Sequence, residues 1–191
     1  MLTKAQLREL YQAPSERSQK KLLNELEEHG KLFISRSPLV VISTHSETGR
    51  CDCSPRGGEP GFVRILSDSQ IAIPDFRGNN RLDSLENIVE TGEIGCVFLV
   101  PGISETLRIN GSASVHVDPE IMGQFEDADS VRTYILVDIK EVYIHCGKAL
   151  LRSEIWDAST HVNPLDFPSF GTIFNAHLGK TVLPESHEEI A

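Results

Sequence analysis

The chain has 191 residues and a formal net charge of −10 at neutral pH, so it is long enough for a substantial core and lacks the basic surface that binds a nucleic-acid backbone. No apolar run approaches the ~18 residues of a membrane helix, and the first residues lack the apolar stretch of a signal peptide. These features argue against nucleic acid and membranes as partners and predict a cytoplasmic protein.

The N-terminal residues 1–34 have a helical pattern. Thr3 can cap a first short helix, whose apolar residues are Leu7, Leu10 and Tyr11. A second helix is expected to begin at residues 14–16 and to end at Gly30; its apolar residues are Leu22, Leu23 and Leu26. We expect this segment to be a helical lead-in that covers the end of a sheet or packs on a second subunit.

Strand patterns follow the lead-in. They lie at residues 39–44, 50–53, 62–66, 70–73, 94–100, 105–117 and 134–144. A turn at 46–49 joins the first two as a hairpin, Gly111 inside the longest segment indicates a β-bulge, and Asp118-Pro119 starts a short helix or turn. Hairpin-like spacing with short helical insertions predicts a mainly β (α+β) fold, with an antiparallel, barrel-like sheet at residues 35–160. The sequence contains no Rossmann or P-loop motif.

A strand-to-helix turn is predicted after the fourth strand. Pro74 ends that strand because proline donates no ladder hydrogen bond, and apolar residues at helical spacing follow, which are Leu82, Leu85 and Ile88. Asn79 and Asn80 suit the turn because asparagine tolerates left-handed backbone and caps free amides. We expect this helix to begin at Asn80 or Arg81.

The turn is unusually basic for a helix start. Arg77 and Arg81 bracket it, although arginine in a first helical turn is disfavoured by ~0.3–1 kcal/mol. Two guanidinium groups, free amides and asparagine donors together suit a bound phosphate. The alternative is that Arg77 is a solvated turn residue and that Arg81 pairs with Asp75 or Asp83.

Other basic side chains have two interpretations each. Arg56 stands in a glycine- and proline-rich loop at a strand end, where it is either an exposed loop residue or a site residue. A helix over 145–156 would place three basic side chains on one face, which are His145, Lys148 and Arg152. Such a stripe is either a solvated face or a site for an anionic or aromatic ligand. The tail, 161–191, is expected to pack on the barrel or on a second subunit, with residues 185–191 disordered.

The four cysteines do not indicate a disulfide framework, because they are few and scattered. Cys51 and Cys53 are separated by one residue, so in a strand they point to one face. A metal site would need two more ligands at a workable spacing, and His145 with Cys146 is a poor second pair. We therefore expect no metal.

The chain resembles the FMN-binding split-barrel proteins related to pyridoxamine 5′-phosphate oxidase. The resemblance covers roughly residues 35–160 and rests on motifs that occur in the same order, which are Ser54-Pro55-Arg56-Gly57, Pro60-Gly61-Phe62-Val63, Pro74-Asp75, Arg77-Gly78-Asn79-Asn80-Arg81-Leu82-Asp83, Pro101-Gly102, Glu105-Thr106-Leu107-Arg108, Asn110-Gly111, His145-Cys146-Gly147-Lys148-Ala149, Arg152-Ser153 and Trp156. Residues 163–191 do not match the C-terminal segment of the true oxidases. FMN binding is therefore implied more strongly than the vitamin B6 reaction.

The resemblance implies a set of FMN-binding residues. The cofactor phosphate would lie on Asn80 and Arg81, with Arg77 and Asn79 close by. Ser43 and Thr44 would lie near the ring or the ribityl chain, and Thr106 and Arg108 at the edge of the isoalloxazine ring. Ser54 is a further residue expected to bind the cofactor. Arg56 would lie at the pyrimidine side, where a cation stabilises the charge that develops on reduction.

The resemblance also implies a homodimer with FMN at the subunit interface, so that His145, Lys148 and Arg152 reach the partner subunit's cofactor. The function implied is two-electron transfer through noncovalent FMN, between a small-molecule substrate and an acceptor. No side chain is an obvious acid or base, so no catalytic residue is named. The alternatives are a non-catalytic flavin-binding, stress or sensor protein, and a split barrel that binds another anionic ligand.

Overall fold

The computed structural model describes residues 1–11, 13, 15–16 and 20–179. The chain divides into two units, Met1–Arg152 and Ser153–Ala191. Among the described residues, the strands all lie in the first unit, and the second contains short helices. Within the described residues, no helix is both long enough and apolar enough to cross a membrane.

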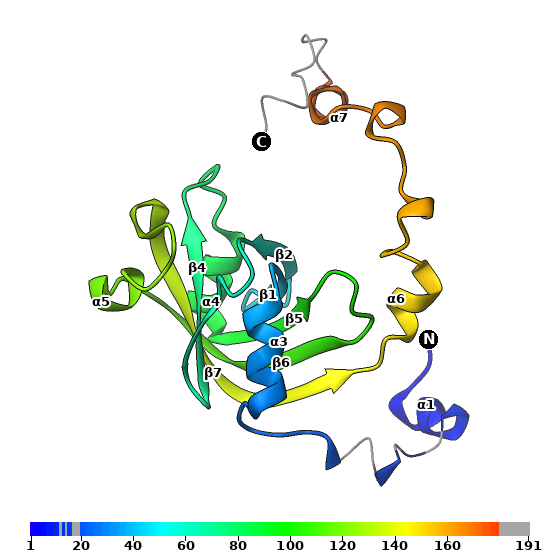
Figure 1. Cartoon of the computed structure of the whole chain (residues 1–191). Coiled ribbons are helices and arrows are strands. Elements are labelled where there is room, and N and C mark those ends of the chain that lie inside the picture. The colour runs from blue at the N-terminus through cyan, green and yellow to red at the C-terminus, as the bar shows by residue number, and fades with distance from the viewer. Residues whose placement is uncertain (12, 14, 17–19, 180–191) are drawn as a thin grey trace. The chain divides into compact units, whose positions relative to one another are not determined.

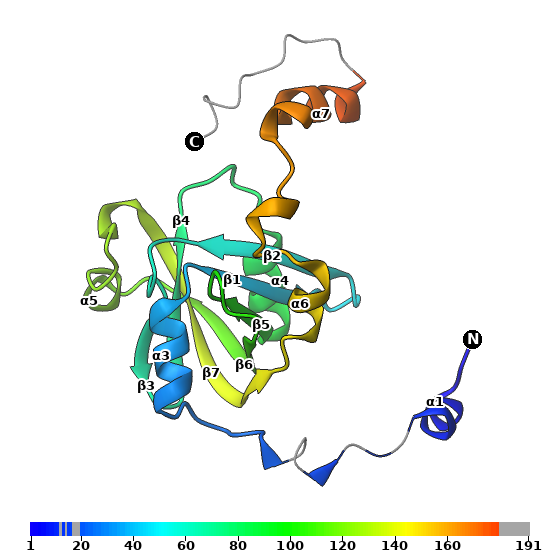
Figure 2. The ribbon, with the colours of Figure 1, turned by 45° about the vertical axis from the view of Figure 1, so that its right-hand side comes forward.

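Seven antiparallel strands form one sheet, in the order β2-β1-β5-β6-β7-β4-β3. The strands are β1 (Leu39–His45), β2 (Cys51–Gly57), β3 (Arg64–Ser67), β4 (Gln70–Phe76), β5 (Glu93–Leu99), β6 (Thr106–His116) and β7 (Val131–His145). Figures 1 and 2 show the strongly twisted sheet from two sides. The predicted mainly β, antiparallel fold is confirmed, and the sheet is open because β2 and β3 are edges that do not pair.

Alternating side chains of the strands fill the core. Leu107 and Ile109 on β6 are fully buried, as their alternation predicts, and so is Phe98 on β5. Helix α4 (Asp83–Thr91) adds Leu85 and Ile88 to the same cluster. The core therefore attaches α4 to the sheet, which fixes the position of the loop that precedes α4.

The β-bulge predicted at Gly111 is confirmed. The register between β6 and β7 shifts between Asn110 and Gly111. A β-carbon at position 111 would lie 2.2 Å from the carbonyl oxygen of Asp138 on β7. Only glycine permits this approach of the two backbones.

The N-terminal segment differs in part from the prediction. Helix α1 (Lys4–Leu10) has the predicted Thr3 cap, in a capping box with Gln6. The second predicted helix is confirmed at Glu16 and Lys20, which are helical, and wrong from residue 21 onward. There Leu23 pairs with Val142 of β7 through two backbone hydrogen bonds of 3.0 and 2.8 Å. Part of that predicted helix, residues 14 and 17–19, lies outside the described residues.

The edge of β7 explains this difference. Strand β4 pairs with β7 only as far as Asp138, and the amide of Ile139 still donates to Ser69, so the residues of β7 after Ile139 have free backbone groups on the edge that faces away from β6. Leu23 satisfies two of them, and a free backbone group at a sheet edge is a strong pairing partner. Helix α3 (Glu28–Arg36) was not predicted, and Gly30, which was expected to end a helix, lies in its first turn.

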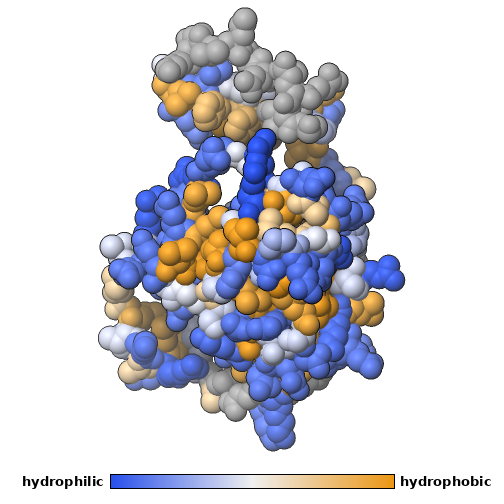
Figure 3. All heavy atoms as spheres, turned by 90° about the vertical axis from the view of Figure 1, so that its left-hand side faces the viewer, coloured by the Kyte–Doolittle hydropathy of each residue, from blue (hydrophilic) through white to orange (hydrophobic). Residues whose placement is uncertain are grey.

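The remaining helices are short. Helix α5 (Pro119–Met122) follows Asp118, whose carboxylate caps it, as the Asp-Pro pair predicts. The described part of the chain has three 3-10 turns, at Ala128–Ser130, Ala158–Thr160 and Pro164–Asp166. Figure 3 views the molecule from the side on which α5 lies and shows apolar residues gathered there among hydrophilic ones.

Two α-helices follow β7 in the described residues, α6 (Lys148–Ser153) and α7 (Phe170–Leu178). In α7 the rings of Phe170 and Phe174 stack 5.7 Å apart and are half exposed. The predicted packing of the tail on the barrel or on a second subunit remains a prediction. Residues 180–191, which include the segment expected to be disordered, lie outside the described residues.

Candidate functional site

A cavity of about 600 Å³ lies where the two ends of the open sheet approach each other, and we call it the split cavity. It is lined by residues of β2, β4, β7, α4 and the loop between β4 and α4. Its lining residues are Arg56, Asp75, Phe76, Arg77, Gly78, Asn79, Asn80, Arg81, Leu82, Leu85, Arg132 and Thr133. Four arginines and one acid make this lining cationic in a protein whose net charge is −10.

An ion pair connects the two ends of the sheet inside this cavity. Arg56 Nη1 on β2 lies 3.1 Å from Asp75 Oδ1 on β4, although these strands are not neighbours in the sheet. Asp75 is 9% exposed. Burial raises the pKa of the Asp75 carboxyl, and the charge of Arg56 partly opposes that rise. Arg56 is therefore the group that stabilises the buried carboxylate.

Two polar atoms in the split cavity are buried and have no hydrogen-bond partner among the described residues. They are Arg56 Nε and Thr133 Oγ1. Unsatisfied buried polar groups are rare, because each costs ~1–3 kcal/mol unless something fills its hydrogen-bonding capacity. Both residues line the cavity, so a polar ligand bound there could supply the partners.

The loop that precedes α4 has the conformation that its asparagines predict. Asn80 is in the left-handed region, with φ of 60°, and Asn79 Oδ1 accepts a hydrogen bond from the amide of Arg81 at 2.9 Å. The expected helix start at Asn80 or Arg81 is wrong, because α4 begins at Asp83. The left-handed residue keeps the chain out of the helix, and Leu82 at the N-cap position gives no side-chain cap.

The later helix start changes the electrostatics of the turn. Asp83 and Glu86 occupy the first turn of α4, as the helix dipole favours, and Arg81 lies before the helix. Arg81 Nε pairs with Asp83 Oδ2, one of the two partners considered from the sequence. This pair is exposed on the arginine side, where 71% of the side chain contacts solvent. Within the described part of the chain, Arg77 and Arg132 form no ion pair.

The split cavity collects five of the ten residues that were predicted to bind the cofactor. They are Arg56, Arg77, Asn79, Asn80 and Arg81. Ser54 lies two residues before Arg56 and shares its face of β2 but does not line the cavity. Thr106 and Arg108 lie on β6, where Thr106 is buried and the Arg108 guanidinium lies 5.4 Å from the centre of the Tyr143 ring.

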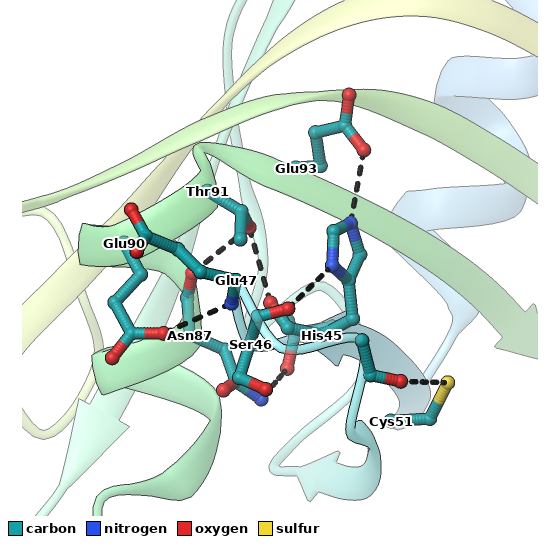
Figure 4. Close-up of polar contacts among 10 residues, drawn as sticks. His45, Ser46, Glu47, Cys51, Asn87, Glu90, Thr91 and Glu93 are labelled. Carbon is teal, nitrogen blue, oxygen red and sulfur yellow. Dashed lines mark hydrogen bonds and ion pairs between the residues drawn. The ribbon is translucent and has the colours of Figure 1, made fainter.

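Ser43 and Thr44 lie away from the split cavity, in a second cavity of about 600 Å³ that residues of β1, β2, β5, β6 and β7 line. Thr44 is buried, and its hydroxyl accepts a hydrogen bond of 3.0 Å from Asn87 of α4. Thr91 of α4 donates to the carbonyl of His45 at 3.2 Å (Figure 4). These contacts fix α4 against β1, so Thr44 has a clear structural role in positioning the loop.

His45 adds a pH-dependent contact beside this junction. Its Nε2 lies 3.1 Å from Glu93 Oε2, and its Nδ1 lies 3.0 Å from the carbonyl of Ser46 (Figure 4). Both contacts raise the pKa of His45, with the Glu93 side chain as the larger cause. A raised folded-state pKa stabilises the fold at low pH, and this contribution is lost as the pH rises through that value.

We expect His45→Gln to be destabilised relative to the parent protein below pH ~6.5, the ordinary histidine value. The difference should shrink as the pH rises above the folded-state pKa, because neutral histidine no longer pairs with Glu93. Urea unfolding at a series of pH values measures this. His161→Gln, at another exposed histidine, is the control, and a His45→Gln effect that does not vary with pH would contradict the assignment.

The prediction that His145 lies on a helix with Lys148 and Arg152 is wrong. Strand β7 continues to His145, and only Lys148 and Arg152 lie on a helix, α6. The strand extends because His145 pairs with Thr106 of β6, which satisfies its backbone within the sheet. None of the three lines the split cavity.

Sequence reasoning missed Arg132 and Thr133, which line the split cavity from β7. Thr133 lies opposite Asp75 in the β4–β7 ladder, so strand pairing is what places it at the site. The sequence contains no local signal for this, since the two residues are far apart in the chain. Asp75 was considered only as a partner for Arg81, and its partner is Arg56.

Comparisons with known proteins agree with this fold. Among solved structures, HupZ of Group A Streptococcus superposes with a TM-score of 0.50 and 14% identity, covering 62% of this chain and 93% of its own. An FMN-binding protein of Syntrophomonas wolfei gives 0.43 and 11%, covering 61% and 82%. HutZ of Vibrio cholerae, named a heme storage protein, gives 0.44 and 10%, covering 61% and 89%. No curated protein sequence matches the chain significantly.

The family is decided by the sequence profile. The model described as pyridoxamine 5′-phosphate oxidase matches residues 26–146, which is more than half of the chain and includes all seven strands. The open seven-stranded antiparallel sheet and the similarity to HupZ agree with that match. By this match, the chain belongs to the pyridoxamine 5′-phosphate oxidase family of split-barrel proteins.

Proposed function

We propose that the split cavity binds FMN noncovalently and that the protein is an FMN-dependent oxidoreductase. The observation that carries this proposal is that one cavity combines four arginines with two buried polar atoms that lack partners, Arg56 Nε and Thr133 Oγ1. A phosphate dianion fits such a lining, because its oxygens accept several charge-assisted hydrogen bonds at once.

Donors reach the proposed phosphate from three parts of the fold. The loop supplies Arg77 and Arg81, β2 supplies Arg56, and β7 supplies Arg132 and Thr133. The resemblance suggested a place for Arg56 at the pyrimidine side of the flavin. Because Arg56 lines the same cavity as the phosphate loop, we assign its guanidinium to the phosphate instead.

The pairing of Arg81 with Asp83 is compatible with phosphate binding. An exposed ion pair contributes only ~0–1 kcal/mol, and the Arg81 side chain is 71% exposed. A hydrogen bond between charged groups contributes ~1.5–3 kcal/mol. Arg81 therefore gains more by turning to the phosphate than it loses by leaving Asp83.

The chain's own role is to bind and orient the cofactor. The described residues that line the split cavity include no histidine, lysine, cysteine or tyrosine, and Asp75 is the only acid. The cavity therefore offers few groups for proton transfer near neutral pH. When bound, FMN supplies two-electron chemistry toward a small-molecule substrate.

The same lining favours a second candidate, a non-catalytic flavin-binding protein that acts as a store, sensor or stress protein. Such a protein needs the phosphate donors but no proton-transfer group. Anaerobic mixing with reduced nicotinamide or a pyridoxine-type amine separates the two. Bleaching of the flavin by the donor, with recovery of its colour each time oxygen is admitted, supports the oxidoreductase. A flavin that binds but is never reduced supports the second candidate.

Two measurements test the cofactor itself. The purified protein should show flavin absorption near ~375 and ~450 nm. After the flavin is removed, FMN should bind at least ~100-fold more tightly than riboflavin, because riboflavin lacks the phosphate that the arginines contact. A colourless protein that binds neither flavin would overturn the proposal. Equal affinities for the two flavins would show that the split cavity does not bind the FMN phosphate.

We expect Arg81→Ala to weaken FMN binding by ~1.5–3 kcal/mol, the scale of one charged hydrogen bond. Fluorescence titration of the flavin-free protein measures the change. Riboflavin affinity should stay constant in the variant. The control is Arg36→Ala, an exposed arginine at the end of α3 and outside the cavity. Parental FMN affinity in Arg81→Ala would exclude Arg81 from the phosphate site.

We also propose a homodimer with FMN at the subunit interface, to which His145, Lys148 and Arg152 of each subunit contribute. Two observations support it. First, none of these three side chains lines the split cavity of its own chain. Second, large apolar side chains are exposed from α6 onward, which are Leu151, Ile155, Val162, Leu165, Phe167, Phe170, Phe174 and Leu178. Light scattering should give twice the 21.2 kDa of one chain, and a monomer at micromolar concentration would contradict this.

A further inference from the structure

A smaller cavity of about 300 Å³ adjoins the split cavity and has the opposite electrostatic character. The two share Phe76 in their linings. The residues that line the smaller cavity are Gly58, Glu59, Phe62, Pro74, Phe76, Phe125, Glu126 and Asp127. It thus combines three phenylalanine rings with three carboxylates and contains no basic residue. We call it the acidic cavity.

The apolar part of the acidic cavity is formed by aromatic side chains. Phe62 and Phe125 are buried, with 7% and 4% of their surfaces exposed, whereas Phe76 is 36% exposed. Phe76 therefore provides most of the exposed ring surface on which an apolar group can be buried, and the fully buried Pro74 supports this wall from behind. Aromatic rings also attract cations through their negative faces, which adds to the effect of the acids.

The acids at this cavity are not neutralised by the protein. Glu59, Glu126 and Asp127 are exposed and form no ion pair within the described parts of the chain. Asp127 occupies the N-cap position of the 3-10 turn at Ala128–Ser130, yet its side chain makes no capping hydrogen bond. An aspartate at such a position usually caps the turn, so its carboxylate is left available to another partner.

The walls of the acidic cavity are held together by one side chain. Arg64 Nε donates to the carbonyl of Gln124 at 2.8 Å, and Arg64 Nη1 donates to the carbonyl of Gly61 at 3.2 Å. Gln124 precedes the wall formed by 125–127, and Gly61 precedes Phe62 in the other wall. The two acidic segments are therefore kept close together by a fixed contact, despite the repulsion between their charges.

We propose that the acidic cavity binds an organic cation with an apolar body, such as a quaternary ammonium compound. The body packs on the ring of Phe76 and on the small exposed parts of Phe62 and Phe125, and the positive group lies at the carboxylates. The size suits this, because small-molecule sites are typically cavities of ~300–1,000 Å³ with an apolar lining and a few polar groups. The proposal extends beyond FMN binding and does not require it, since the acidic cavity shares only Phe76 with the split cavity.

Calorimetric titration of the full-length chain with benzyltrimethylammonium tests the proposal, with benzyl alcohol and benzoate as neutral and anionic probes. The ammonium probe should bind at least ~10-fold more tightly than the alcohol, because it adds attraction to two or three carboxylates, and benzoate should not bind. Similar affinities for the ammonium and alcohol probes, or no binding of the ammonium probe, would overturn the proposal.

Two variants locate the site. Glu59→Gln/Asp127→Asn should weaken binding of the ammonium probe ~10-fold, and Phe76→Leu should weaken it several-fold by removing ring surface. The control, Glu25→Gln/Glu105→Gln, removes two exposed acids outside the cavity with the same change of net charge and should bind as the parent does. Parental binding in the first variant would overturn the assignment, and full competition by millimolar Ca²⁺ would identify an unspecific acidic surface instead.

The test of cation binding in the acidic cavity can be distinguished from the test of FMN binding in the split cavity. The titration is carried out on the flavin-free protein and repeated after flavin is added. Loss of cation binding with normal FMN binding rejects only the acidic cavity, and the reverse result rejects only the cofactor proposal.

Discussion

Replacing Arg56 by alanine is expected to lower the free energy of unfolding by ~3 kcal/mol at neutral pH, because it removes one partner of a largely buried ion pair. Asp75 is 9% exposed, and its only ion-pair partner among the described residues is Arg56, at 3.1 Å. Without Arg56 the carboxylate is buried and uncompensated. The pair also connects β2 with β4, the two regions where the open sheet comes together. Urea unfolding of the flavin-free protein measures the loss.

The loss should depend on pH in a defined direction. Burial already raises the pKa of Asp75, and Arg56 is the group that opposes this rise. The variant should therefore have a still higher folded-state pKa. A carboxyl whose pKa is higher in the folded than in the unfolded state destabilises the fold above the folded value, and the penalty disappears as the pH falls toward the unfolded value of ~3.9. The variant should thus approach the parent protein on acidification.

The double variant Arg56→Ala/Asp75→Asn is the control. It removes the charge that Arg56 compensates, so it should recover much of the stability at neutral pH. FMN affinity should stay low in both variants, since the phosphate donor is missing in each. A single variant as stable as the parent, or a loss that does not diminish on acidification, would show that the ion pair does not hold the two ends of the sheet.

Gly111→Ala is expected to destabilise the protein by ~3 kcal/mol, at the upper end of the cost of overpacking. The new β-carbon would lie 2.2 Å from the carbonyl oxygen of Asp138 and 3.0 Å from its carbonyl carbon. Both atoms belong to the backbone of β7, so β6 and β7 must separate at the bulge. The clash cannot be relieved by the movement of a flexible side chain, because the contacting atoms belong to the backbone. Chemical denaturation gives the change in free energy.

Gly78→Ala provides the matched control for stability. No atom lies within 4 Å of the β-carbon that it would introduce, and Gly78 is not among the residues with positive φ. Its free energy of unfolding should stay within ~0.5 kcal/mol of the parent value. If Gly111→Ala were no less stable than Gly78→Ala, the close approach of β6 to Asp138 would not be a constraint on the fold.

Much of the fold could be predicted from local pattern. Leu107 and Ile109 alternate with polar residues because one face of β6 is buried, and Thr3 caps α1 through a contact within one turn. The prediction of a helix that ends at Gly30 was wrong because it considered only local spacing. The spacing of Leu22, Leu23 and Leu26 is compatible with a helix, but Leu23 pairs with the open edge of β7, a partner more than a hundred residues away.

The candidate site also contains some residues that local sequence predicts and some features that it does not. Arg77, Asn79, Asn80 and Arg81 were predicted because they are close in sequence and their charges oppose the usual preference of a helix start. The exact start of α4 was not predictable from spacing, since the left-handed Asn80 and the Asx turn at Asn79 delay it to Asp83.

The sequence by itself determined the antiparallel strand pattern, the bulge at Gly111 and the basic loop, because each depends on residues that are neighbours along the chain. Only the tertiary structure decided that Arg56 pairs with Asp75 and that Thr133 joins the same cavity. These contacts exist because β4 pairs with β7 and the curled sheet brings β2 to β4. Strand order and closure depend on packing over long sequence separations, for which local spacing carries no signal.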